Sequence, residues 1–149
     1  MSAPAELTIR LARPEEQPQL VALQRRASLA LEDYRAQLEA EPDAIQLPIE
    51  QIERGSVLVA ELDDRVAGFA VILIDEEIAE LDGLFVEPEL WKRAIGASLV
   101  DVVVHEARRQ GLAVTVIASP SARGFYERCG FALEGEAQTR FGPAIRMSR

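Results

Sequence analysis

Along several short stretches of the chain, apolar and polar residues alternate or β-branched residues gather, and both patterns are typical of strands. Strands are predicted at Leu7–Arg13, Ser56–Leu62, Val66–Ile74, Ile78–Val86, Leu112–Ala118, Phe131–Ala137 and Arg140–Met147. Turn residues at 63–64 and 75–77 separate the second, third and fourth strands, so these three are predicted to form an antiparallel meander. The fifth strand is nearly all apolar and is therefore expected to be buried on both faces.

Between the predicted strands, apolar residues recur at the spacing of helices that pack on one side. Helices are predicted at Glu15–Leu31, over Tyr34–Ile52 with a break around Pro42 or Pro48, from Ile95 until Gly111, and at Ser121–Cys129. The third has a predicted buried face of Ile95, Leu99, Val102, Val103 and Ala107 and an outer face of Asp101, His105, Arg108 and Arg109. No repeat or linker interrupts these elements, so residues 1–149 are interpreted as a single α/β domain.

Composition and charge narrow the class of protein. The chain has 149 residues, 48% of them hydrophobic and 28% charged, which is the balance of a folded domain. No apolar run reaches the roughly 18–20 residues of a membrane-spanning helix, and Met1–Glu6 lacks the features of a secretory signal, so we expect a cytoplasmic protein. A net charge of −9 argues against nucleic acid as a partner. The lone cysteine and the lack of clustered metal-ligating residues argue against disulfides and a metal site.

The segment from Leu84 to Leu99 joins a predicted strand to a predicted helix through small and basic residues. The first backbone N–H groups of a helix lack partners within the helix, and together with the helix dipole they attract anions. Lys92 and Arg93 add positive charge beside this turn, so it is a candidate site for a diphosphate. The alternative is that the small residues only let the helix pack closely against the sheet.

This turn is similar to the cofactor-binding turn of the GCN5-related N-acetyltransferase (GNAT) family, and the resemblance covers nearly the whole chain. In that family an apolar-Val-x-Pro phrase precedes Arg/Gln-x-x-Gly-x-Gly/Ala, which binds the diphosphate of acetyl-CoA. The corresponding residues here are Leu84-Phe85-Val86-Glu87-Pro88 and Trp91-Lys92-Arg93-Ala94-Ile95-Gly96-Ala97. Trp91 replaces the usual Arg or Gln and Ala94 replaces the first Gly, which leaves Gly96 as the clear match. A methyl group at Ala94 would weaken binding where backbone approaches phosphate, and the basic pair could compensate.

A second segment, Ser119 to Phe131, resembles the family's Asn-x-x-Ala-x-x-Phe-Tyr-x-x-x-Gly-Phe signature, with Ser119 in place of Asn. In the family the tyrosine lies beside the CoA sulfur and often protonates the departing thiolate, a role that passes here to Tyr126. The alternative is that Tyr126 only packs with Phe125 and Phe131. The resemblance implies cofactor contacts at Leu84, Phe85, Val86, Lys92, Arg93, Ala94, Ile95, Gly96, Ala97, Ser98, Ser119, Ala122 and Phe125. It also implies a mixed, mostly antiparallel sheet of about seven strands, flanked by about four helices and splayed at the cofactor site.

An amine must be neutral to attack a thioester, so the reaction needs a proton acceptor. Glu80 and Asp82 are the candidates, because they alternate on one face of the predicted strand that ends at Val86, where acetyltransferases of this kind often place their base. The alternative is that both are solvated carboxylates on a sheet face. Backbone N–H groups near Leu84 to Val86 could stabilise negative charge on the thioester oxygen.

The favoured function is therefore transfer of an acetyl group from acetyl-CoA to a primary amine by direct attack, without a metal. The acceptor would be a small-molecule amine or a protein amino group that enters between residues 31–52 and the C-terminal strand pair. In the first of these regions Tyr34, Glu32 and Asp33 could contact a cation, and helix capping and solubility explain the two acidic residues equally well. Exposed strand edges, together with the many dimers in this family, make a homodimer a reasonable expectation.

The sequence also gives expectations for Cys129 and His105, and it leaves one rival function open. Cys129 is interpreted as a packing residue and not as a nucleophile, and His105 is expected at the surface. The rival is a non-catalytic module that binds an acyl-CoA or a partner protein and has lost the full diphosphate turn. Trp91 and Ala94 are the residues that favour this alternative.

Overall fold

The computed structural model describes residues 6–31, 35–41, 43, 45–91, 93–140 and 142–149. These residues form a seven-stranded sheet in the order β1-β2-β3-β4-β5-β7-β6, antiparallel except between β4 and β5. The strands are β1 (Leu7–Leu11), β2 (Val57–Leu62), β3 (Arg65–Ile74), β4 (Ala79–Val86), β5 (Val114–Ala118), β6 (Ala132–Thr139) and β7 (Gly142–Ser148). The predicted meander and the mixed, mostly antiparallel sheet are confirmed.

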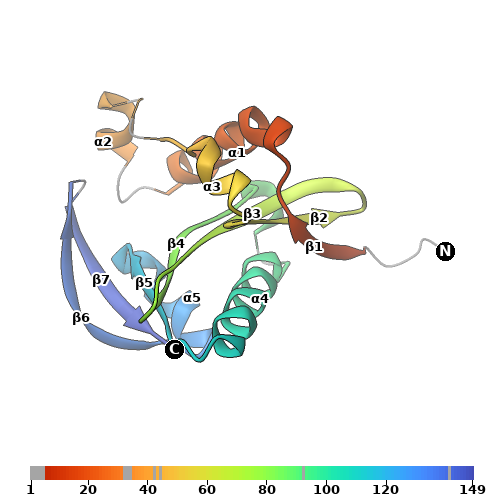
Figure 1. Ribbon diagram of the computed structural model, residues 1–149. Coiled ribbons are helices and arrows are strands. Elements are labelled where there is room, and N and C mark those ends of the chain that lie inside the picture. The colour runs from red at the N-terminus through yellow and green to blue at the C-terminus, as the bar shows by residue number, and fades with distance from the viewer. Residues whose placement is uncertain (1–5, 32–34, 42, 44, 92, 141) are drawn as a thin grey trace.

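Helices cover both faces of this sheet (Figure 1). The helices are α1 (Gln17–Leu29), α2 (Arg35–Ala40), α3 (Ile49–Glu53), α4 (Ile95–Arg109) and α5 (Arg123–Arg128), with 3-10 turns η1 (Pro14–Glu16), η3 (Pro88–Leu90) and η4 (Pro120–Ala122). Helices α1, α2 and α3 lie over one face, whereas α4 and α5 lie over the other. The broken second stretch becomes two helices, so the described residues form five helices where the sequence predicted about four. No helix among the described residues has both the length and the apolar character needed to cross a membrane.

Buried side chains form one cluster under each helical layer. The cluster beneath α4 includes Ile95, Leu99, Val100, Val103, Val104 and Ala107 from that helix. Val102 was predicted to be buried but is only partly so, because the stripe that meets the sheet is centred on Leu99 and Val103 and leaves Val102 at its flank. The cluster beneath α1 joins Leu20, Leu23 and Ala27 to Phe69 and Val71 of β3.

Strand β5 differs from its prediction. Val114, Val116 and Ala118 are buried toward α4, but Thr115 is only partly buried and Ile117 is 36% exposed. Burial on both faces was wrong because the buried cluster beneath α1 takes residues from β2 and β3 and none from β5. One face of β5 is therefore left open to solvent on the side of α1.

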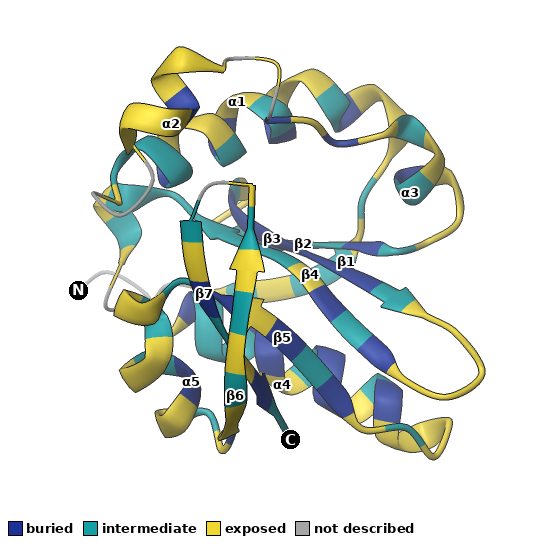
Figure 2. Cartoon of the chain, turned by 90° about the vertical axis from the view of Figure 1, so that its left-hand side faces the viewer, coloured by how far each residue is buried: buried dark blue, intermediate teal, exposed yellow. Residues whose placement is uncertain are grey.

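The sheet splays between β4 and β5 (Figure 2). The two strands pair in parallel only from Ala79 to Leu81, so within the described part of the chain the rest of β4 has no neighbouring strand on that side. A β-bulge at Asp82 adds one residue to β4, because the next residue that pairs with β3 is Gly83. The extra residue shifts the alternation of β4, so that Leu84 and Val86 pack toward α4 and Phe85 packs toward α1.

An ion pair ties α1 to the residue that follows β4. The guanidinium of Arg26 donates from Nε and Nη2 to the two carboxylate oxygens of Glu87, both at 2.9 Å. The Glu87 side chain is only 19% exposed, and its backbone N–H donates to Ala67 of β3. Two parallel hydrogen bonds orient the pair, so the end of β4 is held against α1 as well as against β3.

Candidate active site

The backbone of β4 presents hydrogen-bonding groups on the side that β5 has left. Residues of antiparallel strands alternate between hydrogen-bonded and non-hydrogen-bonded pairs. The Glu87 N–H donates to Ala67 at 2.9 Å, which makes Val86 a member of a non-hydrogen-bonded pair, and the alternation does the same for Leu84. The N–H and C=O groups of Leu84 and Val86 therefore point away from β3. An extended ligand with amide groups can bind there as an added strand would.

Helix α4 begins beside this edge without a side-chain cap. Its first three N–H groups belong to Ile95, Gly96 and Ala97. The first helical hydrogen bond runs from the Ser98 N–H to the Ala94 carbonyl, and the Ser98 hydroxyl donates to the same oxygen at 2.9 Å. Arg93 is exposed next to this turn, whereas Lys92 lies outside the described residues. The three N–H groups and the positive end of the helix dipole fit a diphosphate.

Gly96 brings three elements of the candidate site together. A β-carbon at this position would lie 3.2 Å from the Phe125 ring of α5 and 3.7 Å from the Val86 side chain of β4. The lack of a side chain therefore lets the start of α4 pack against both elements. The two interpretations of the small residues, a diphosphate site and close packing of the helix against the sheet, are therefore compatible. Close packing also sets the position of the N–H groups.

Ala94 adopts a left-handed backbone conformation, with φ 60° and ψ 16°. This conformation costs a residue with a β-carbon roughly 1–2 kcal/mol, and glycine avoids most of that cost. Ala94→Gly is therefore expected to raise the free energy of unfolding by about 0.5–1 kcal/mol, measured by urea denaturation. The control is Ala97→Gly in the right-handed first turn of α4, which should lower it by about 1 kcal/mol. A loss of stability in Ala94→Gly would contradict this account.

Tyr126 is placed with its ring in the core and its hydroxyl in slight contact with solvent. The ring packs edge-to-face with Phe125 at 5.0 Å and Phe131 at 5.4 Å, and the residue is only 7% exposed. Among the described residues no buried polar side-chain atom lacks a partner, and Tyr126 makes no hydrogen bond to them, so its hydroxyl must reach solvent. Burial raises the pKa of Tyr126 well above its usual value, and the nearby Cys129 adds to this effect. The hydroxyl therefore stays protonated at neutral pH.

Glu80 and Asp82 lie where the sheet begins to splay. Glu80 is level with Thr115 of β5, and Asp82 is the bulge residue immediately after the last residue of β4 that pairs with β5. Burial raises the pKa of Glu80, and the negative charge of Asp82 raises it further, so the two carboxylates are close enough to interact. Burial also raises the pKa of Asp82, although its side chain remains exposed at the surface. A raised pKa suits a carboxylate that accepts a proton.

The other predicted site residues fall in three groups. Ser119 and Ala122 lie at the end of β5 and in η4, where the Ser119 and Ser121 hydroxyls are 3.2 Å apart, and Ala122 packs against the cluster beneath α4. Phe85 is not brought to the open edge, because the shift in alternation at the bulge places its ring against Phe69, 5.2 Å away. Tyr34, Glu32 and Asp33 lie outside the described residues.

His105 and Cys129, which were not predicted to be site residues, lie as the sequence analysis expected. His105 is exposed on α4. Burial raises the pKa of the Cys129 thiol, which disfavours the thiolate that a nucleophile needs. No group of three or more His, Cys, Asp or Glu side chains within the described part of the chain is placed to hold a metal ion.

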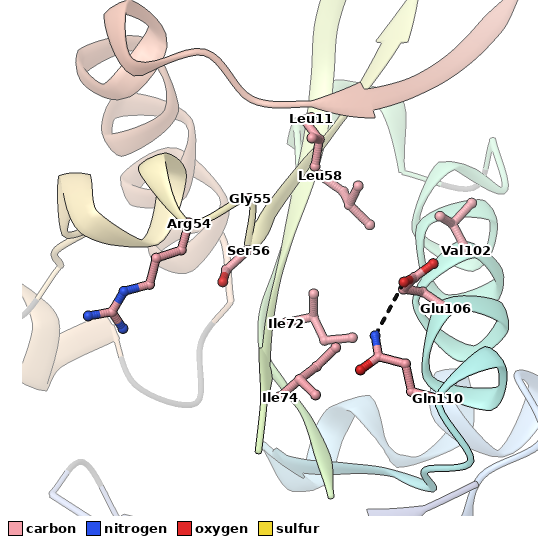
Figure 3. Close-up of a pocket in the computed structure, with 10 residues that line it drawn as sticks. All are labelled: Leu11, Arg54, Gly55, Ser56, Leu58, Ile72, Ile74, Val102, Glu106 and Gln110. Atoms are coloured by element: carbon pink, nitrogen blue, oxygen red, sulfur yellow. Dashed lines mark hydrogen bonds between the residues drawn. The ribbon is translucent and has the colours of Figure 1, made fainter. Parts of the chain in front are cut away.

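A cavity of about 600 Å³ lies away from these residues (Figure 3). Apolar side chains of β1, β2 and β3 form one wall, and the C-terminal half of α4 forms the other. Its lining residues include Leu58, Ile72, Val102, Glu106 and Gln110, and none of the predicted catalytic or cofactor-binding residues. The cavity is therefore distinct from the candidate active site.

Comparisons with known proteins agree with the family that the sequence resembles. The model of the acetyltransferase (GNAT) family matches residues 23–131. No curated protein matches the chain by sequence. A PaiA N-acetyltransferase from Thermoplasma acidophilum in complex with coenzyme A is 20% identical, with a TM-score of 0.78 over 97% of this chain and 98% of that one. Arabidopsis thaliana Naa50, in complex with the bisubstrate analogue CoA-Ac-MVNAL, is 15% identical, with a TM-score of 0.72 over 96% and 97%.

Proposed function

Because the chain belongs to the acetyltransferase (GNAT) family, we propose that it transfers an acetyl group from acetyl-CoA to a primary amine by direct attack. One observation carries this proposal: the open edge of β4 meets the uncapped start of α4, which places amide-binding groups beside an anion site. Acetyl-CoA has the matching order of groups, since its pantetheine arm carries amides and ends in a diphosphate. Bound there, acetyl-CoA supplies an activated acetyl group as a thioester.

The residues of the chain have separate roles in the proposed reaction. Leu84 and Val86 bind and orient the cofactor arm through their backbone groups, and the first turn of α4 holds the diphosphate. Glu80 or Asp82 accepts the proton of the amine, directly or through water. A backbone N–H of β4 stabilises negative charge on the thioester oxygen. No covalent bond to the enzyme forms.

The raised pKa of Tyr126 refines its proposed role. An ordinary phenol has a pKa of about 10 and a thiol about 8.5, and burial raises the pKa of Tyr126 above its ordinary value. Full transfer of the proton from Tyr126 to sulfur is therefore unfavourable. Tyr126 instead acts mainly as a hydrogen-bond donor that stabilises the charge on the departing sulfur.

The acceptor is proposed to be cationic before it loses its proton. Two adjacent carboxylates and a net charge of −9 favour an ammonium group over an anionic substrate. The analogue bound to Naa50 joins CoA to a peptide, so peptide amino termini belong among the candidate acceptors together with small amines. A cytoplasmic location and a homodimer are part of the same proposal.

Thermal unfolding with acetyl-CoA tests the cofactor site. A ligand present at 100 times its dissociation constant should stabilise the protein by about 2.7 kcal/mol, which is a measurable rise in melting temperature. No rise at millimolar acetyl-CoA would refute the proposal. If a rise is seen, release of free thiol is then measured with a panel of small amines and peptides. Binding without thiol release would favour the rival function, a non-catalytic acyl-CoA-binding module.

A further inference from the structure

Trp91 makes a hydrogen bond to the open edge of β4. Its indole N–H donates to the Val86 carbonyl, with 2.9 Å between Nε1 and oxygen. This is the same carbonyl that the β3–β4 pairing leaves pointing away from β3. The Trp91 residue is 40% exposed, and its backbone N–H donates to Pro88 at 3.3 Å. The indole is thus tied to the edge by one hydrogen bond while much of its surface stays in water.

A ligand that lies along this edge requires the same carbonyl. An added strand or an amide-bearing chain pairs by donating N–H groups to the carbonyls of the edge and accepting from its N–H groups. Only Leu84 and Val86 present such groups beyond the bulge, so Val86 provides one of two acceptors. In the structure that acceptor already has one donor, the Trp91 indole. A carbonyl oxygen has two lone pairs, so a bound ligand either adds a second donor at this oxygen or replaces the indole N–H.

We propose that Trp91 caps the Val86 carbonyl in the free protein and that the pantetheine arm of the cofactor displaces its indole N–H. This inference rests on the proposed function, because it takes acetyl-CoA as the ligand of the open edge. Trp91 then lowers the affinity for the cofactor by the strength of the hydrogen bond that is lost. The effect is confined to ligands that carry the amide arm, since the diphosphate binds at α4 and not at Val86.

Trp91→Phe tests the exchange, because it keeps an aromatic ring and removes the N–H donor. A typical net hydrogen bond corresponds to an affinity change of about three- to tenfold, so the variant should bind CoA tighter by about that factor. ADP is the matched control ligand, since it has the diphosphate and lacks the amide arm, and its affinity should not change. Both dissociation constants are measured by titration calorimetry. Weaker or unchanged CoA binding by the variant would overturn the inference.

A second measurement uses the native protein and needs no variant. Trp91 is the single tryptophan of the chain, so the intrinsic fluorescence reports on this indole alone. Saturating CoA should shift its emission, and pantetheine, which has the amides without the diphosphate, should shift it in the same direction. An emission spectrum that CoA leaves unchanged would overturn the displacement. If CoA does not bind at all, the proposed function fails; if CoA binds without these effects, only the role of Trp91 fails.

Discussion

Glu80→Gln is expected to lower kcat by about 10²–10⁴-fold, the range that a general base contributes, and to leave acetyl-CoA affinity unchanged. Glutamine keeps the size of the side chain but cannot take a proton from the amine. The rate is measured as thiol release at saturating substrates, and cofactor binding is measured by thermal shift. Glu77→Gln is the matched control, because Glu77 is exposed in the turn before β4 and should have no effect.

Asp82→Asn distinguishes the two carboxylates by pH dependence. A base works in its deprotonated form, so kcat/KM rises with pH through the pKa of that group. The negative charge of Asp82 raises the pKa of Glu80, and its removal should move the acidic limb of the profile to lower pH. If Asp82 is itself the base, the rate is lost at every pH instead. Full activity in both single variants would exclude the proposed carboxylate base.

Gly96→Val is expected to weaken acetyl-CoA binding more than about tenfold and to lower stability by about 1–3 kcal/mol. A β-carbon there would already lie 3.2 Å from the Phe125 ring, and two further methyl groups must displace the ring or the first turn of α4. Either movement disturbs the N–H groups that are proposed to hold the diphosphate. The dissociation constant is measured by calorimetry and the stability by urea denaturation.

Gly135→Val provides the control for this substitution. A β-carbon at Gly135, on β6, would meet no atom within 4 Å, so the same change should leave cofactor affinity unaltered. Native affinity in Gly96→Val would show that the start of α4 does not bind the cofactor. Loss of affinity in both variants would point to a general effect of valine on the fold.

Much of the site region could be predicted from local patterns. The alternation that ends at Val86, the small residues that follow it and the helical spacing from Ile95 onward are properties of neighbouring residues, and each produced the expected element. The same is true of Gly96, whose place at the start of a helix is visible without a structure. Local patterns also identified Glu80 and Asp82 as neighbours on one strand.

Contacts between distant residues could not be predicted in this way. No local pattern indicates that Glu16 is buried and accepts two hydrogen bonds from Arg10, which lower its pKa. The pair of Arg26 and Glu87 joins residues 61 positions apart, and no spacing rule indicates it. The indole of Trp91 was read as a departure from a motif, and only the structure shows its bond to β4.

By itself, the sequence determined which segments are strands and helices and which turn carries the candidate diphosphate site. Those properties follow from periodicity and from backbone groups at a helix start, which depend on neighbouring residues. Tertiary structure alone decided that β4 and β5 separate after Leu81 and that a bulge at Asp82 turns the backbone groups of Leu84 and Val86 toward the open edge. It also decided that the Trp91 indole N–H donates a hydrogen bond to the Val86 carbonyl. These features depend on which strands pair and where the pairing stops, and that information is spread over residues far apart in the chain.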